Sequence, residues 1–142
     1  TIARQMALYR AALARVRKPF PAELPMMREI CVGDSRATAL ALARPGLEQK
    51  YRAYVAWGQH KALPDDDDMT QAFDELLRDR FILGDPARCA DELQRCVDET
   101  GANTLIFRVG WPGMAQESIL ANLRRLGEEV RPRLSAPARP TG

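Results

Sequence analysis

Apolar residues recur along this chain with two spacings, every second residue in short segments and every third or fourth residue in longer ones. The clearest stretch holds an apolar run at 81–83, a turn at 84–86, helically spaced apolar residues from 90 to 97, and a second apolar run at 104–107. Short apolar runs are typical of strands and the longer spacing is typical of helices. This stretch therefore predicts strand, helix and strand, which is one unit of a parallel α/β fold.

The turn between the first strand and the helix has a suitable residue at each position. Gly84 allows a tight exit from the strand, Asp85 can accept hydrogen bonds from the first free N–H groups of the helix, and Pro86 suits the first helical position. The Gly-Asp-Ser segment at 33–35 has the same character. We therefore expect another strand to end there and another helix to begin.

The remaining elements follow from the same two spacings. An alternating segment at 24–32 predicts a strand, with one face carrying Met26, Arg28, Ile30 and Val32 and the other carrying Met27, Glu29 and Cys31. Two charges in the middle of a strand are unusual if that strand is buried. Helical spacing predicts helices at 2–17, 35–44, 47–58, 69–78 and 116–130, with Pro45 and Gly46 separating the second from the third.

One compact domain is expected for 142 residues, and the alternation of strands and helices predicts a parallel sheet. Three strands alone leave long apolar faces uncovered. The chain also starts at Thr1 inside a helical pattern, so we expect a fragment of a longer protein or a subunit of a homo-oligomer. We assign 1–134 to the domain and the Pro-rich segment 135–142 to a flexible tail.

Charge and cysteine usage exclude several classes of function. The 21 basic and 19 acidic side chains nearly cancel and the arginines are scattered, so nucleic acid is not an expected partner. No apolar run approaches the roughly 20 residues that span a bilayer, and no signal peptide pattern is present, so we expect no membrane association. Three cysteines without a CxxC pair favour a reduced compartment, and we expect a cytoplasmic protein.

We expect no metal site. The single histidine, His60, is distant in sequence from Cys31, Cys89 and Cys96, so the ligand spacing typical of zinc is absent. The acidic run at 65–68 lacks the spacing and the turn glycine of an EF-hand loop. We interpret it as a solvated loop whose last residue caps the following helix.

Four segments resemble one family in their order and separation. They are 27–34, 79–86, 101–108 and 128–134, and together they are similar to the C-terminal part of the bacterial luciferase-like flavin-dependent monooxygenases. The resemblance implies an α/β fold that is the C-terminal part of a (β/α)8 TIM barrel, with about three parallel strands and their flanking helices. These strands would be the sixth, seventh and eighth of the barrel.

The same resemblance implies an oxidoreductase that binds FMN, with F420 as the alternative cofactor. Its partners would be a small organic substrate and O2. The family's flavin platform lies on earlier strands, so this chain would lack the main flavin site and would be inactive alone. It would then form the substrate side of the complete enzyme.

Two residues are candidates for catalysis, because active sites of (β/α)8 barrels lie at the C-terminal ends of strands and on the loops that follow. Arg28 matches an arginine inside the barrel of related sulfonate-cleaving members, and a guanidinium there could steady an anion. The alternative role of Arg28 is an ion pair with Glu29 or a helix residue. Trp111 could wall the pocket and exclude water, or it could only fill space.

Three further residues are candidates for cofactor binding. Arg108 could meet a phosphate or the substrate if it faces inward, and otherwise it extends outward between helices. Gly84 and Asp85 could position N–H groups for an anion at a helix N-terminus. The Asp85 carboxylate would occupy the place of that anion, so simple helix capping is the favoured interpretation.

A different class of function also fits the pattern. The chain could be a non-catalytic α/β interaction domain, in which exposed strand edges and apolar helix faces are covered in a homodimer. The helix that starts at Met69 and the helix that ends at Val130 would then form the contact. An aldolase-type barrel is disfavoured because Lys18, Lys50 and Lys61 all fall on predicted helix ends or loops.

Overall fold

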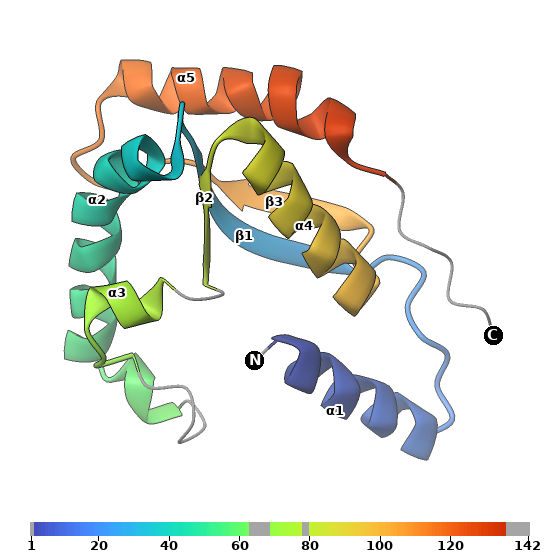
Figure 1. Cartoon of the computed structure of the whole chain (residues 1–142). Helices are drawn as coiled ribbons and strands as arrows, with labels where there is room; N and C mark the ends of the chain where they lie inside the picture. Colours follow the sequence, from blue (N-terminus) through green and yellow to red (C-terminus); the bar gives the residue numbers. More distant parts are fainter. Residues whose placement is uncertain (1, 63–68, 78–79, 136–142) are drawn as a thin grey trace.

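A computed structural model describes residues 2–62, 69–77 and 80–135 of the chain. Its main elements, in chain order, are α1 (Ile2–Arg15), β1 (Pro25–Val32), α2 (Arg36–Ala56), α3 (Phe73–Leu76), β2 (Phe81–Gly84), α4 (Pro86–Thr100), β3 (Thr104–Arg108) and α5 (Gln116–Arg125). Figure 1 shows their arrangement. The acidic run at 65–68 and most of the predicted tail, 136–142, lie outside the described residues.

The three strands form one parallel sheet with the order β2-β1-β3. Along β1, Glu29 to Val32 pair with Phe81 to Gly84 of β2, and Pro25 to Glu29 pair with Thr104 to Arg108 of β3. The predicted α/β class with three parallel strands and flanking helices is therefore confirmed. β1 is the central strand, and it is the strand that carries the two charges noted in the sequence.

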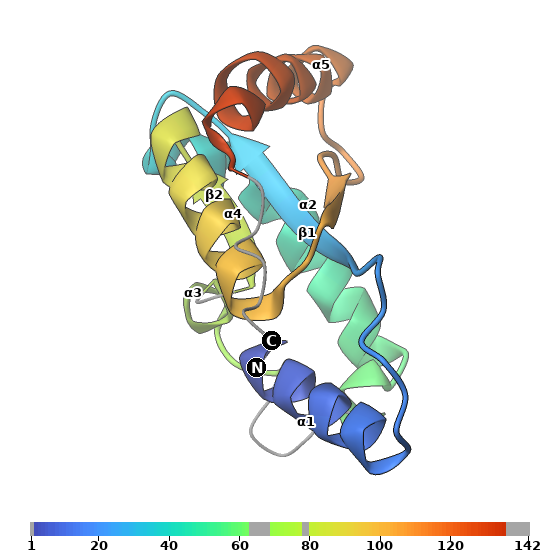
Figure 2. The ribbon, with the colours of Figure 1, turned by 90° about the vertical axis from the view of Figure 1, so that its right-hand side faces the viewer.

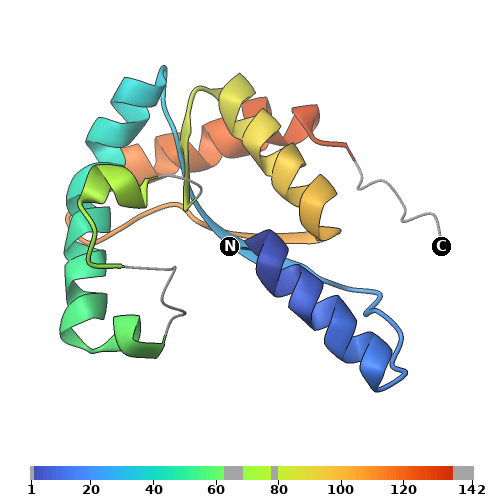
Figure 3. The ribbon, with the colours of Figure 1, turned by 60° about the horizontal axis from the view of Figure 1, so that its bottom comes forward.

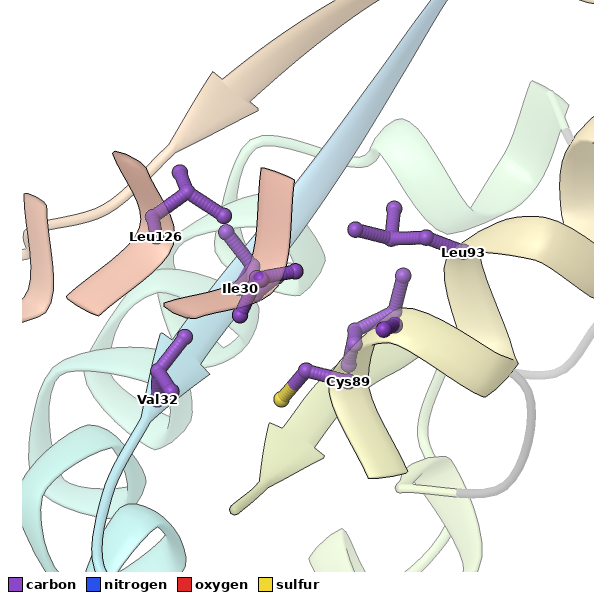
Figure 4. Close-up of a cluster of buried hydrophobic side chains, with 8 residues drawn as sticks. Ile30, Val32, Cys89, Leu93 and Leu126 are labelled. Carbon is purple, nitrogen blue, oxygen red and sulfur yellow. The ribbon is translucent and has the colours of Figure 1, made fainter. Parts of the chain in front are cut away.

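Helices cover both faces of this sheet (Figures 1 and 2). On one face, Cys31 of β1 and Leu83 of β2 pack against Ala43 and Leu47 of α2. The opposite face carries Ile30, Val32 and Ile82, which pack against Cys89, Ala90 and Leu93 of α4 and against Leu126 and Val130 beyond α5 (Figure 4). The alternation of β1 side chains predicted from the sequence thus separates two apolar cores.

The strand order differs from the consecutive order of a closed (β/α)8 barrel, in which each strand lies beside the next and all helices lie outside. Here β3 pairs with β1, and α2 lies on the opposite side of the sheet from α4. The order β2-β1-β3 with helices on two faces is the local arrangement of a doubly wound sheet. Closure into a barrel therefore stays a prediction.

The two helices predicted at 35–44 and 47–58 are in fact one helix, α2, which continues through Pro45. A proline inside a helix removes one backbone hydrogen bond and usually bends or ends the helix. In α2, the buried residues Ala39, Ala43 and Leu47 lie on both sides of Pro45 and pack on the sheet. The free energy gained by burying this helix face outweighs the loss of a backbone hydrogen bond at Pro45. The local sequence around the proline does not show this gain.

The helix predicted at 69–78 is also wrong in length, because α3 comprises only Phe73–Leu76. Its N-cap is Ala72, whose side chain accepts no hydrogen bond. A helix this short without a capping side chain has little stability of its own. α3 is instead held by Leu76, which is buried, and by the stacking of Phe73 on Phe81.

α1 lies at the periphery, beside the C-terminal end of α4 (Figure 3). Arg10 donates from Nη2 to the backbone oxygen of Thr100 at 2.9 Å, and its guanidinium lies over the ring of Phe20. Leu8 of α1 and Val16, the residue after its end, are exposed. Within the described part of the chain, no helix combines the length and the apolar character needed to cross a membrane.

Candidate functional site

A buried cluster of charges lies on the face of the sheet that α2 covers. Glu29 of β1 pairs through Oε1 with Lys50 Nζ of α2 and with Arg108 Nη1 of β3, the latter at 3.2 Å. The Glu29 and Lys50 side chains are only 11% and 14% exposed, whereas that of Arg108 is 41% exposed. The cluster is therefore open to solvent on the side of Arg108.

Two cations share one carboxylate in this cluster. Burial, and next to it the charge of Arg108, lower the pKa of Lys50 to about 8. The Glu29 carboxylate opposes this shift because it stabilises the ammonium form. The second carboxylate oxygen, Oε2, is buried and forms no hydrogen bond with any described residue. With both cations charged, the cluster carries an excess of positive charge and one unused acceptor.

Trp111 lies on the same face, just beyond the end of β3. The residue is 5% exposed and packs in the α2 core with Cys31 and Leu47. Gly46 makes this contact possible, because a Cβ at position 46 would lie only 2.4 Å from Cβ of Trp111. The indole Nε1 is buried without a partner among the described residues. Trp111 thus fills the core, as in the space-filling interpretation, and also keeps an unused donor.

Arg28 lies on the opposite face of the sheet. It is the register partner of Phe107, whereas its neighbour Glu29 is the partner of Arg108. Its Nη2 donates to Sγ of Cys96 in α4 at 3.4 Å, and its buried Nε has no partner among the described residues. The predicted ion pair between Arg28 and Glu29 does not form, because adjacent strand residues point to opposite faces. The structure thus separates Arg28 from Arg108 and Trp111.

Gly84 and Asp85 form the junction between β2 and α4. Asp85 is the N-cap of α4, and its Oδ1 accepts from the backbone N–H of Arg88 at 3.0 Å. This hydrogen bond lowers the pKa of Asp85 below its ordinary value. The backbone oxygen of Gly84 accepts from the N–H of Gly33 at 2.9 Å, and a Cβ at Gly84 would collide with the Arg88 side chain. These contacts match the capping interpretation.

Sequence reasoning placed Arg108 and Trp111 in the site and missed Glu29 and Lys50 as its centre. One signal was present, since a charge in the middle of a predicted strand needs a partner if it is buried. A second was the spacing of Ala43, Leu47 and Lys50, which puts the lysine on the buried side of α2. The wrong break at Pro45 concealed this spacing, because it placed Lys50 in a separate helix.

Two solved structures share this fold. Over 92% of this chain and 37% of the other, the fold matches monooxygenase RslO1 from Streptomyces bottropensis, with a TM-score of 0.68 and 17% identity. Over 97% of this chain and 41% of the other, it matches the oxygenating constituent of 3,6-diketocamphane monooxygenase from the CAM plasmid of Pseudomonas putida, a type II Baeyer-Villiger monooxygenase in complex with FMN, with a TM-score of 0.67 and 19% identity.

The chain therefore has the fold of part of two monooxygenases. It spans about two fifths of the length of each. The resemblance to flavin-dependent monooxygenases stated from the sequence is confirmed at the level of the fold. No protein-family model matches the chain, and no curated protein matches it significantly.

Proposed function

We propose that this chain is the C-terminal part of a luciferase-like flavin-dependent monooxygenase, and that it forms the substrate side of the site without the main flavin platform. One observation carries this proposal: the fold matches two monooxygenases over nearly all of this chain but only about two fifths of theirs. The FMN in one of them supports FMN as the cofactor. F420 stays the alternative, and a small organic molecule and O2 are the proposed substrates.

Two features on the α2 face fit a bound cofactor or substrate. Arg108 has the most exposed side chain of the charge cluster, and Trp111 keeps a buried donor at Nε1. A guanidinium at an open edge suits a phosphate or carboxylate, and a buried indole excludes water. Bound FMN would supply the reaction with O2. Arg108 would hold an anionic group in place, and Trp111 would form a dry wall.

The other predicted site residues have different proposed roles. Gly84 and Asp85 fix the loop after β2 through the cap of α4. Arg28 would act only if the complete protein opens the α4 face, because its guanidinium now contacts Cys96. The free thiols of Cys31, Cys89 and Cys96 support a reduced compartment, and we place the protein in the cytoplasm.

The proposal is tested by expressing the chain alone and together with the coding sequence that precedes Thr1, and by titrating each protein with FMN and with F420. Quenching of flavin fluorescence should be absent or weak for the chain alone and saturable for the longer protein. In the longer protein, Arg108→Gln should weaken cofactor or substrate binding, whereas the exposed Arg36→Gln should not. A longer protein that binds neither cofactor contradicts the proposal.

A homodimeric interaction domain remains a second candidate because one part of the sheet is uncovered. Met27 of β1 and Ile106 of β3 are register partners, and they are 57% and 45% exposed. Neighbouring apolar side chains on an open sheet favour association. Light scattering during size exclusion tests this, since Met27→Lys should convert a dimer to a monomer. A monomer before substitution contradicts it.

A further inference from the structure

A pocket of about 340 Å³ lies between the C-terminal half of α2 and the segment 69–76 that contains α3. Its apolar wall consists of Tyr51, Val55, Met69, Phe73 and Leu76. The volume is within the range of ~300–1,000 Å³ that is usual for small-molecule sites. Two aromatic rings in an apolar wall suit a flat, ring-containing ligand.

The aromatic wall of this pocket is held in place by Phe81, the first residue of β2. The ring of Tyr51 meets the ring of Phe81 edge to face, with centroids 5.3 Å apart. The ring of Phe73 stacks on Phe81 at 6.0 Å with an interplanar angle of 20°. Because Phe81 is buried in the sheet, both pocket rings rest on a fixed support. A wall that is ordered before binding loses little entropy on binding.

Among the described residues, two acidic groups near the pocket, Glu48 and Asp74, are paired. Arg44 donates from Nη1 to Oε1 of Glu48 at 3.2 Å, and its Nη2 pairs with Asp74. The Arg44 guanidinium also lies over the ring of Phe73, at 4.9 Å from the centroid. The negative charge of Glu48 at the rim is thus matched within the structure.

Arg52 is the other charged residue that lines the pocket. It is exposed and lies one helical turn from Glu48, yet it forms no ion pair with the described residues. A guanidinium without an ion pair among the described residues, beside an apolar, ring-lined pocket, complements a molecule with a ring body and a carboxylate. The apolar wall therefore fits the ring body of such a ligand, and Arg52 fits its carboxylate.

The pocket borders the charge cluster, because Lys50 Nζ lies 5.7 Å from the centroid of the Tyr51 ring. It lies apart from the loops that follow the strands. It is at the start of β2, beside Phe81, whereas Gly84, Asp85 and Trp111 follow the C-terminal ends of the strands. In parallel α/β folds the reacting groups are found at the C-terminal ends. A ligand at the opposite end would not take part in chemistry there.

We propose that the pocket between α2 and α3 binds a small aromatic carboxylate, with the rings of Tyr51 and Phe73 against its ring body and Arg52 against its carboxylate. This proposal rests on the lining of the pocket and does not use the proposed flavin chemistry. A negative result for this pocket therefore leaves the proposed function untouched, and the reverse also holds.

The test uses the chain as it is, with the naphthoate anion as the probe and naphthylmethanol as its neutral counterpart. Calorimetric titration should give saturable binding of naphthoate. Arg52→Gln should weaken that affinity about tenfold, as expected for the loss of a charge-assisted hydrogen bond. Arg36→Gln, at the other end of α2, should change it by less than about twofold. Naphthylmethanol should bind more weakly than naphthoate and should be insensitive to both substitutions.

A pocket-filling variant provides a second readout. Val55→Phe should abolish naphthoate binding, and thermal denaturation should show that the variant is folded. If Val55→Phe does not fold, the comparison of Arg52→Gln with Arg36→Gln decides. Absence of saturable binding, or equal effects of the two arginine substitutions, overturns the proposal.

Discussion

The backbone N–H of Val32 donates to Oδ1 of Asn122 at 2.8 Å, although 90 residues separate the two in sequence. Nδ2 of the same amide donates to the backbone oxygens of Ile30 and Val109 at 3.0 and 2.9 Å. The pairing of β1 with β3 ends at Glu29 and Arg108. The Asn122 amide therefore bonds the backbone groups of β1 that lie beyond the last pair with β3. A side chain from α5 thus satisfies backbone groups that a neighbouring strand would otherwise satisfy.

Asn122→Ala should lower the free energy of unfolding by about 3 kcal/mol, because it leaves buried backbone groups without partners. Urea denaturation measures this loss. The matched control is Asn103→Ala, whose amide forms two backbone hydrogen bonds, with Leu24 and Ala22, at an exposed position. Water can replace those bonds, so the control should lose only about 1 kcal/mol. Equal losses would show that burial of Asn122 is unimportant.

Gly46→Ala should destabilise the chain by about 2 kcal/mol, because the new methyl group would overlap Cβ of Trp111. Gly127→Ala is the control, since nothing lies within 4 Å of a Cβ at that helical position. The control should be neutral or stabilising by about 0.5 kcal/mol, as alanine is the better helix former. Thermal denaturation of both variants checks the difference. If Gly46→Ala leaves the stability unchanged, Trp111 can move away from α2 at no cost, and the contact between Gly46 and Trp111 is not tight.

Glu29→Gln should cost about 3 kcal/mol, because it leaves Lys50 buried without its counter-charge. The half-buried pair between Glu48 and Arg44 supplies the control, and Glu48→Gln should cost less than about 1 kcal/mol because Arg44 keeps Asp74 as a partner. Chemical denaturation at neutral pH compares the two. If adding Lys50→Met to Glu29→Gln restores stability, the loss in the single variant comes from burying the unpaired Lys50 ammonium. If it does not, the loss comes from altered packing.

The capping bond of Asp85 gives a dependence of stability on pH. Its pKa is lowered in the folded chain, chiefly by the backbone N–H of Arg88. The folded state therefore binds a proton less readily than the unfolded state, and the contribution is fully present above the unfolded pKa of about 3.9. It is lost as the pH falls through the lower folded pKa. Urea denaturation of the parent chain and Asp85→Ala should differ at pH 6 and converge in acid.

Much of the fold follows from local pattern. The alternation of Met26 to Val32 correctly separated the two faces of the central strand, and Gly84, Asp85 and Pro86 correctly marked the start of α4. These features are encoded by neighbouring residues, because side-chain alternation and helix capping act over a few positions. The single helix through Pro45 was missed because the contacts that bury its face, on the sheet and on Trp111, are distant in sequence.

The site was harder to predict than the fold. Arg108 and Trp111 were found by their position at or after the end of a strand. Lys50, which shares the Glu29 carboxylate with Arg108, comes from a helix and is placed by tertiary packing. Arg28 was expected near the same site, and its actual face follows from the register of β1 with β3. Register depends on which strands pair, and the order β2-β1-β3 cannot be deduced from the spacing of apolar residues alone.

The central position of β1 affects how the chain can fold during its synthesis. β1 leaves the ribosome before β2 and β3, but Arg108, which pairs with Glu29, is made 79 residues later. At ordinary rates of translation of ~5–20 residues per second, the strand waits several seconds for its second neighbour. During that interval the unpaired N–H and C=O groups on that edge of β1 are open to chaperones or to other nascent chains. The three-stranded sheet therefore cannot be complete in the cell before β3 has been made.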